Sequence, residues 1–278
     1  MTRGCRWKTH FLVRPIGSST IGRVAVNTVP DRRVIRLVRA EWLKIRSLRS
    51  VRWIVIAFVL PTVAIIVGLA RTGGTALAQS TEVRLAASVL PAVVLMQIAV
   101  AIVSVVVTGS EYTHGVIRAS LTMAPRRGLL LTAKYVAAAG FGFLVGLVTA
   151  AIAIAITAVF SDRGGEWNAV LMRAGFGAGA YLAVLAVLAA ALTVLVRGTA
   201  TAVLIVIAVV YVVPLIAVPL IPGLTGTVGE FWPTTIGLTL VAPPGVGTVP
   251  PAAGFLVFVA ECAIPVILSW LLFDRRDA

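Results

Sequence analysis

The sequence predicts an all-α integral membrane protein: six transmembrane helices, cytoplasmic N- and C-termini, and an amphipathic interfacial helix before the first span. Three observations support this fold class. The chain is 59% hydrophobic and 12% charged, with a mean hydropathy of +1.03, whereas soluble domains are about half apolar and a quarter charged. Six apolar stretches approach the roughly 20 residues that a helix needs to cross a bilayer. The basic residues also gather on one side of the resulting topology.

The chain before the first span divides into two parts. Residues 1–32 are polar, rich in arginine and broken by Gly and Pro, which predicts a disordered basic cytosolic tail. In residues 33–50, apolar side chains recur every three or four positions and most basic side chains fall on the other side. This pattern predicts an amphipathic interfacial helix. The alternative is a juxtamembrane anchor whose charges only set the orientation.

The transmembrane domain, residues 51–278, has spans at about 53–70, 85–109, 135–160, 174–196, 199–221 and 252–273. An even number of spans places both termini on one side. The opposite side holds only four of the 24 basic residues: Arg71, Arg84, Arg163 and Arg173. The positive-inside rule therefore predicts cytoplasmic termini. Because the positive charge lies beside apolar spans, the net charge of +14 indicates contact with membrane lipid and not with nucleic acid.

The last outer connection, residues 222–251, is long and rich in Gly and Pro. It contains an apolar run, Ile236–Ala242, that is too short to cross a membrane. Such a run either dips into the outer leaflet and returns, shielded by protein, or lies on the outer surface as a connector. The sequence leaves both possibilities open.

Several classes of chemistry are excluded by missing motifs. The chain has only three lysines, Lys8, Lys44 and Lys134, and none follows a glycine, so a P-loop for ATP is absent. The two histidines and two cysteines form no pattern suited to zinc or to a disulfide framework. We therefore expect no catalytic residues, no cofactor and no metal, and any ATP would have to be handled outside this chain.

Polar groups are rare inside the spans. Glu261 lies in the middle of the sixth span, and such a carboxylate is a candidate pathway or interface residue. Alternatively, it is protonated and hydrogen-bonded to a backbone carbonyl or to Gln97; Gln97 by itself is typical of a polar contact between helices. Four glycines at four-residue spacing predict close helix packing: Gly142 and Gly146, then Gly175 and Gly179.

The polar stretch between the second and third spans predicts a cytosolic helix over about 111–124. Ser110 is the expected N-cap, and Pro125 ends the helix. One side is mainly apolar, with Val116, Ile117 and Leu121, and the other is polar, with Glu111, His114 and Arg118. A passive connector does not need this pattern, whereas a helix that docks into a groove of another protein does.

Two patterns in this region resemble the type-2 exporter class of ABC-transporter permeases. They are Glu111-x-x-x-Gly115-x-Ile117-Arg118-x-x-Leu121-x-x-x-Pro125-x-Arg127 and Glu41-x-x-Lys44-x-x-Ser47-x-Arg49. The first is similar to the family's first cytosolic loop, and the second to its N-terminal interfacial helix. Including the topology, the resemblance covers about residues 33–278.

The resemblance implies a permease subunit of an ABC exporter in the plasma membrane. Two permease chains, as a homo- or heterodimer, would work with two copies of an ABC ATPase subunit. Residues Glu111, His114, Val116, Ile117, Arg118 and Leu121 would couple to that ATPase, and the helix with Glu41, Lys44 and Arg49 would brace it. The mainly apolar spans suit an amphipathic or lipid-like substrate. The alternatives are a membrane scaffold or assembly protein that does not transport, and a secondary carrier that uses Glu261.

Overall fold

The computed structural model describes residues 30–72, 81–113, 127–160, 168–221, 226–243 and 249–275. Every regular element in these ranges is a helix. The N-terminal half contains α1 (Pro30–Ser47), α2 (Arg49–Thr72), α3 (Thr81–Ala87), α4 (Val89–Thr113) and α6 (Arg127–Val159). The C-terminal half contains α7 (Ala169–Val196), α8 (Thr199–Ile207), the π-helix η1 (Ala208–Ala217), α9 (Val218–Leu220), α10 (Thr227–Glu230), α11 (Pro233–Leu238) and α12 (Pro251–Arg275).

Six helical segments are long and apolar enough to cross a membrane, which confirms the predicted fold class. They are Arg49–Thr72, Val83–Tyr112, Gly128–Val159, Ala169–Val196, Thr199–Leu220 and Pro251–Leu272. Each overlaps one of the six expected spans; the first four extend it by several residues at one or both ends, and the last two agree with it to within one residue. The Val- and Ile-rich runs inside them are helical because a single span in lipid must satisfy its own backbone hydrogen bonds.

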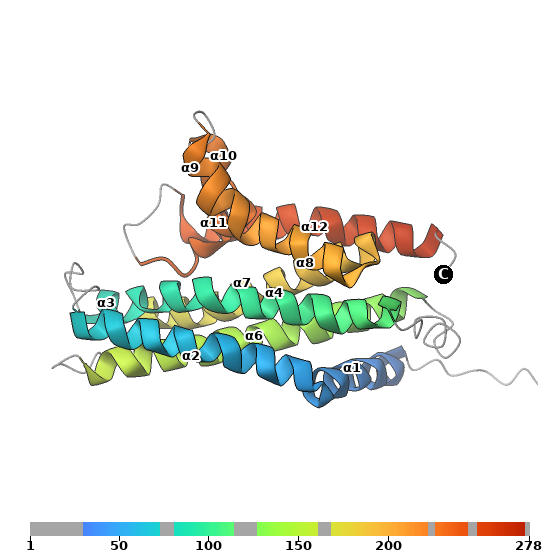
Figure 1. Cartoon of the computed structure of the whole chain (residues 1–278), viewed down its shortest axis with the longest axis horizontal. Coiled ribbons are helices and arrows are strands. Elements are labelled where there is room, and N and C mark those ends of the chain that lie inside the picture. The colour runs from blue at the N-terminus through green and yellow to red at the C-terminus, as the bar shows by residue number, and fades with distance from the viewer. Residues whose placement is uncertain are drawn as a thin grey trace, which may run out of the picture.

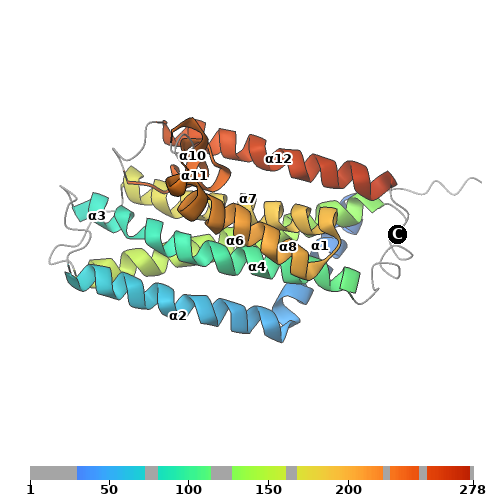
Figure 2. The same cartoon turned by 45° about the horizontal axis from the view of Figure 1, so that its top comes forward.

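The spans form a bundle with α7 near its centre, as Figures 1 and 2 show. Leu182, Leu185 and Ala186 of α7 are fully buried, and α4 and α6 pack against this helix. In contrast, α2, α8 and α12 lie at the periphery and expose large apolar side chains, among them Leu60, Leu204 and Leu256. These exposed faces are the surfaces through which the chain can meet lipid or another protein.

The close packing of α6 on α7 depends on glycine, as the two glycine pairs in the sequence suggested. A Cβ on Gly142 would overlap the backbone carbonyl of Leu182, and one on Gly146 would overlap the carbonyl of Ala178. Gly179 lies against Phe143, whereas Gly175 has open space around it. Three of the four glycines therefore allow close approach, and Gly175 does not take part.

The substitution Gly146→Ala is expected to destabilise the protein by about 1–3 kcal/mol, the usual cost of overpacking. The added methyl group meets backbone atoms of α7, which cannot rotate away as a side chain can. The matched control is Gly175→Ala, because it makes the same change in the facing helix where there is room. Denaturation of both variants in detergent, with the unfolding free energy as the readout, checks this prediction. Equal stability of the two variants would contradict it.

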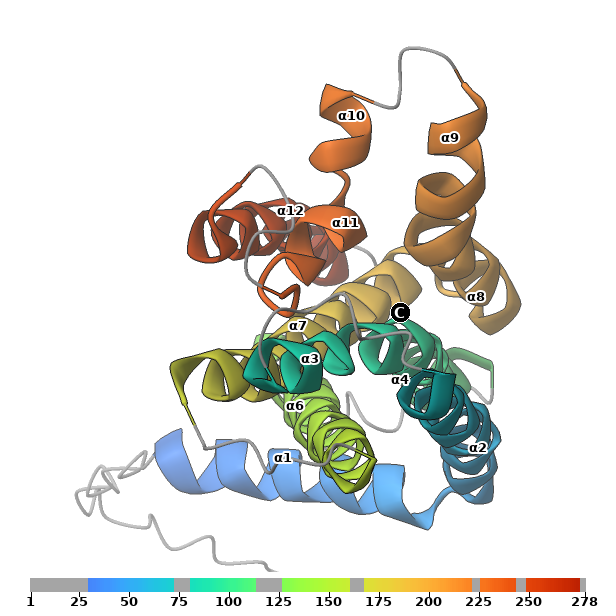
Figure 3. The ribbon, with the colours of Figure 1, turned by 90° about the vertical axis from the view of Figure 1, so that its left-hand side faces the viewer.

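The short helix α1 lies across one end of the bundle, as seen along the spans in Figure 3. The C-terminal part of α12 ends on the same side, since Gly128 at the start of α6 lies against Trp270 of α12. The helix predicted over 33–50 therefore forms, although it begins at Pro30 and ends at Ser47, where the chain turns into α2. Its place in the membrane interface and the cytoplasmic side of this end stay predictions from the charge pattern.

The second span ends later than the sequence suggested. Residues 110–113 continue α4, and the hydroxyl of Ser110 donates a hydrogen bond back to the carbonyl oxygen of Val107 at 3.0 Å. The prediction that Ser110 caps a new helix was therefore wrong, because α4 continues to Thr113 and the buried Glu111 in its last turn is paired with Lys44 and Lys134. The remainder of the predicted coupling helix, residues 114–124, lies outside the described residues.

The outer segment folds back against the bundle. Ile236 and Gly237 of α11 are buried, and Gly237 lies against Tyr181 of α7 and Phe258 of α12. Tyr181 is about 18 Å along α7 from the start of that helix, at 1.5 Å per residue. The Trp232 indole N–H donates to the carbonyl oxygen of Val209 in η1 at 2.8 Å. This depth favours a segment that dips between helices over a connector on the outer surface.

Candidate functional site

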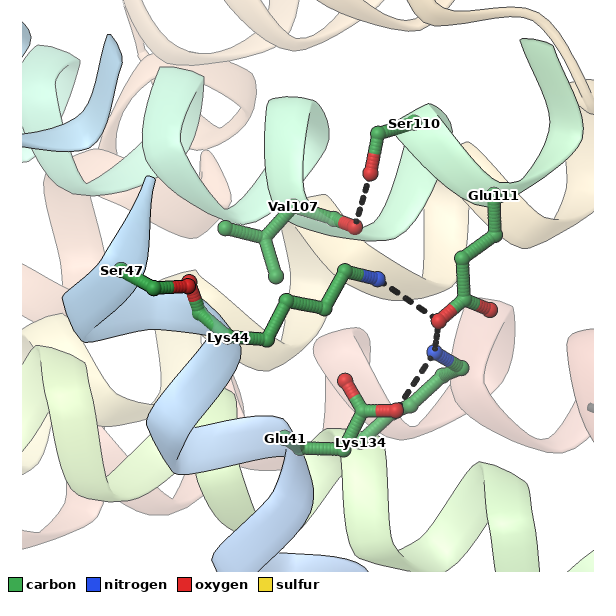
Figure 4. Close-up of polar contacts among 7 residues, drawn as sticks. All are labelled: Glu41, Lys44, Ser47, Val107, Ser110, Glu111 and Lys134. Carbon is green, nitrogen blue, oxygen red and sulfur yellow. Dashed lines mark hydrogen bonds and ion pairs between the residues drawn. The ribbon is translucent and has the colours of Figure 1, made fainter. Parts of the chain in front are cut away.

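Four charged side chains from three helices meet at the α1 end of the bundle (Figure 4). Lys134 of α6 bonds through its Nζ to Glu41 Oε1 of α1 at 2.9 Å and to Glu111 Oε1 of α4 at 2.5 Å. Lys44 of α1 bonds to the same Glu111 oxygen at 2.6 Å. We call these four residues the ion cluster.

Local helix geometry explains why these groups can meet. Glu41 and Lys44 are three residues apart on α1 and so share one face of that helix. Glu111 lies in the last turn of α4, and Lys134 lies two turns into α6. The two membrane helices that carry Glu111 and Lys134 are joined through residues 114–126. The ion cluster therefore holds α1 against both helices that flank this connection.

The ion cluster is electrically balanced and mostly buried. The side chains of Glu41, Glu111 and Lys134 are about one tenth exposed or less, and that of Lys44 is 26% exposed. Glu111 Oε1 accepts from both lysines, whereas its Oε2 is buried and has no partner among the described residues. Because a buried charge without its partner is very unfavourable, this arrangement stabilises one position of α1 relative to α4 and α6.

Apolar contacts surround the ion cluster on the membrane side. Ile45 of α1 and Val51 of α2 pack with Val103 and Val107 of α4 and with Ala137 of α6. These side chains exclude water from the ion pairs on that side, which strengthens their attraction. The same packing fixes the end of α1 against the spans.

The other residues expected to couple to a partner are placed as follows. Glu111 is described, and its carboxylate faces α1 and α6 within the chain, whereas the family resemblance implied a contact with a partner. Arg49 begins α2 and is exposed. His114, Val116, Ile117, Arg118 and Leu121 lie outside the described residues. The sequence singled out Lys134 only as one of three lysines that form no P-loop; its place beside two carboxylates depends on how α1, α4 and α6 pack.

The two candidates inside the spans do not join the ion cluster. Gln97 of α4 is buried and accepts a hydrogen bond from the Tyr181 hydroxyl of α7 at 2.5 Å, so it acts as a polar contact between helices. Glu261 lies on α12, and its Oε2 atom is buried without a partner in the part of the chain that the structure describes. That Glu261 oxygen therefore does not form the bond to Gln97 that was one of the alternatives for this residue.

The comparison with protein families agrees with a bundle of apolar helices. The family model described as ABC-2 family transporter protein matches residues 37–215. The chain belongs to the ABC-2 transporter family. The match includes the ion cluster and the spans from α2 to most of η1. No curated protein matches this ABC-2 permease.

Family membership confirms the resemblance seen in the sequence. With six apolar helices, it supports a multi-pass membrane protein that serves as the permease subunit of a transporter. The plasma membrane is the usual location of such proteins. Membrane subunits of this family are generally not catalytic, and they work with an ABC ATPase and usually as dimers.

Proposed function

We propose that this permease chain, paired with a second copy or a sister permease, forms the pathway of an ABC exporter for an amphipathic or lipid-like substrate. Two copies of a separate ATPase subunit drive it. The exposed apolar faces of α2, α8 and α12 support this proposal, because a pathway between two such chains would have mainly apolar walls. The family match favours transport over the scaffold and secondary-carrier alternatives.

The observation that carries the coupling part of the proposal is the double contact of Lys134 with Glu41 and Glu111. A displacement of residues 114–126 would move the ends of α4 and α6 to which they are joined. The ion cluster couples that movement to α1. Three helices then move together, as a two-state switch driven by nucleotide binding on the partner requires. In this scheme Arg118 contacts the ATPase, and Val116, Ile117 and Leu121 fill its groove or pack on the spans.

Reversing the charge at Arg118 tests the proposal. In a reconstituted complex, Arg118→Glu is expected to lower transport-coupled ATPase activity about tenfold, which corresponds to about 1.4 kcal/mol of lost contact. Membrane insertion should be unchanged, because this residue lies outside the spans. The matched control is Arg71→Glu, which reverses a charge in the last turn of α2, at the end of that helix away from α1. Equal activity of the Arg118 variant and the wild type would refute the coupling role.

A further inference from the structure

A groove opens on the outside of the bundle between α2 and α6, beside the ion cluster. Its volume is about 660 Å³, which is within the range of sites that bind small molecules. Figure 3 shows α2 and α6 on either side, with α1 lying crosswise at their end. Trp42 and Ile45 of α1 line that end of the groove, and the buried Met96 of α4 lies at its bottom.

The two side walls of the groove are apolar over several helical turns. Val55 and Val59 line the α2 side, and Leu144, Val148 and Ile152 line the α6 side. Leu144 and Val148 are about half exposed, so the chain itself does not cover them. Walls of this kind suit a hydrocarbon chain that lies parallel to the spans.

The end of the groove beside α1 is cationic. Arg46 of α1 and Arg52 of α2 line it, and both are exposed. Neither forms an ion pair with another residue that the structure describes. The groove therefore combines a long apolar part with two guanidinium groups that have no anionic partner among the described residues. Arginine is well suited to bind the oxygens of a phosphate in such a position.

We propose that this groove binds one acidic phospholipid from the surrounding bilayer. Arg46 and Arg52 hold its phosphate, and an acyl chain lies between α2 and α6. The charge pattern places α1 on the cytoplasmic side, where acidic lipids give the membrane a negative surface. The bound lipid fills the space between α2 and α6 and joins both to α1. This inference does not rest on the proposed transport function, since a resident lipid needs neither ATP nor a substrate.

Native mass spectrometry of the full-length chain in detergent tests the charged end of the site. With dioleoyl-phosphatidylglycerol and dioleoyl-phosphatidylcholine as competing probes, wild type is expected to retain one phosphatidylglycerol per chain. The double variant Arg46→Gln/Arg52→Gln should bind it about 30-fold more weakly, since each cation near a lipid surface contributes about one kilocalorie per mole of attraction. The control Arg36→Gln/Arg39→Gln removes two exposed α1 arginines that do not line the groove. Equal weakening in both double variants would show diffuse attraction to α1 and overturn the site.

A second pair of variants tests the apolar part. Val148→Trp places a large ring in the groove, whereas Val136→Trp makes the same change at an exposed position of α6 outside it. Only the first is expected to lose the retained phosphatidylglycerol. Retention of the lipid by Val148→Trp would overturn the proposal. The proposal would also be overturned if Val148→Trp dissociated a dimer and left the amount of bound lipid unchanged. That result would mean that the groove of the wild type is filled by a second copy of the chain.

Discussion

Replacing Lys134 with methionine is expected to lower the free energy of unfolding by about 3–5 kcal/mol, the usual cost of removing one partner from a buried ion pair. The lysine joins Glu41 and Glu111, and its side chain is only 7% exposed. Without it, Glu41 loses the cation that binds it, and the remaining three charges sum to −1. Denaturation of the purified variant in detergent measures the loss.

The chain offers a close control for this substitution. Lys44→Met removes the same charge from the same cluster, but the Lys44 side chain is 26% exposed and Glu111 keeps its bond to Lys134. Its cost should therefore be clearly smaller. If the cost of Lys134→Met arises from an unpaired Glu41, adding Glu41→Gln should recover part of it. Strict additivity of these two changes would show that the two groups do not interact and that the cluster is not the cause.

The fold could be predicted from the sequence because a bilayer restricts the possible structures. Spans of about 20 apolar residues have to be helices, so the six apolar stretches of the sequence lead directly to six helices. The amphipathic spacing around Trp42 likewise predicted a helix before the first span. By contrast, the end of α4 was misjudged at Ser110, because a polar residue can end a helix or continue it, and packing on the neighbouring helices decides between the two.

The candidate site was harder to predict than the fold. The sequence marked Glu41, Lys44 and Glu111 as residues that touch a partner, but it gave no sign that they touch one another. Lys134 is 93 residues from Glu41 along the chain, and the two meet only because α1 lies across the end of α6. A shared place on one helix face, as for Glu41 and Lys44, is visible in a sequence, whereas a contact across three helices requires the packed structure.

Replacing residues 114–124 with a Gly/Ser linker is expected to abolish co-purification of the ATPase, while the spans and the ion cluster stay folded. The change begins after Thr113 because α4 continues to that residue, so Glu111 and its bonds are preserved. If this segment fits a groove on the ATPase, its loss removes the apolar contacts that give such docking its affinity. Affinity purification of the permease, followed by quantification of the bound ATPase, provides the measurement.

The companion variant Glu111→Gln separates docking from transmission. It keeps residues 114–126 but removes the carboxylate that binds Lys44 and Lys134. The ATPase should still co-purify, whereas substrate-stimulated ATP hydrolysis should fall at least several-fold, because the ion pairs that join α1 to α4 are lost and only apolar packing remains between them. Lys134 keeps Glu41 as a partner, so this variant should remain folded. If Glu111→Gln released the ATPase as fully as the linker does, Glu111 would belong to the docking contact itself. If it left hydrolysis unchanged, the ion cluster would serve stability alone.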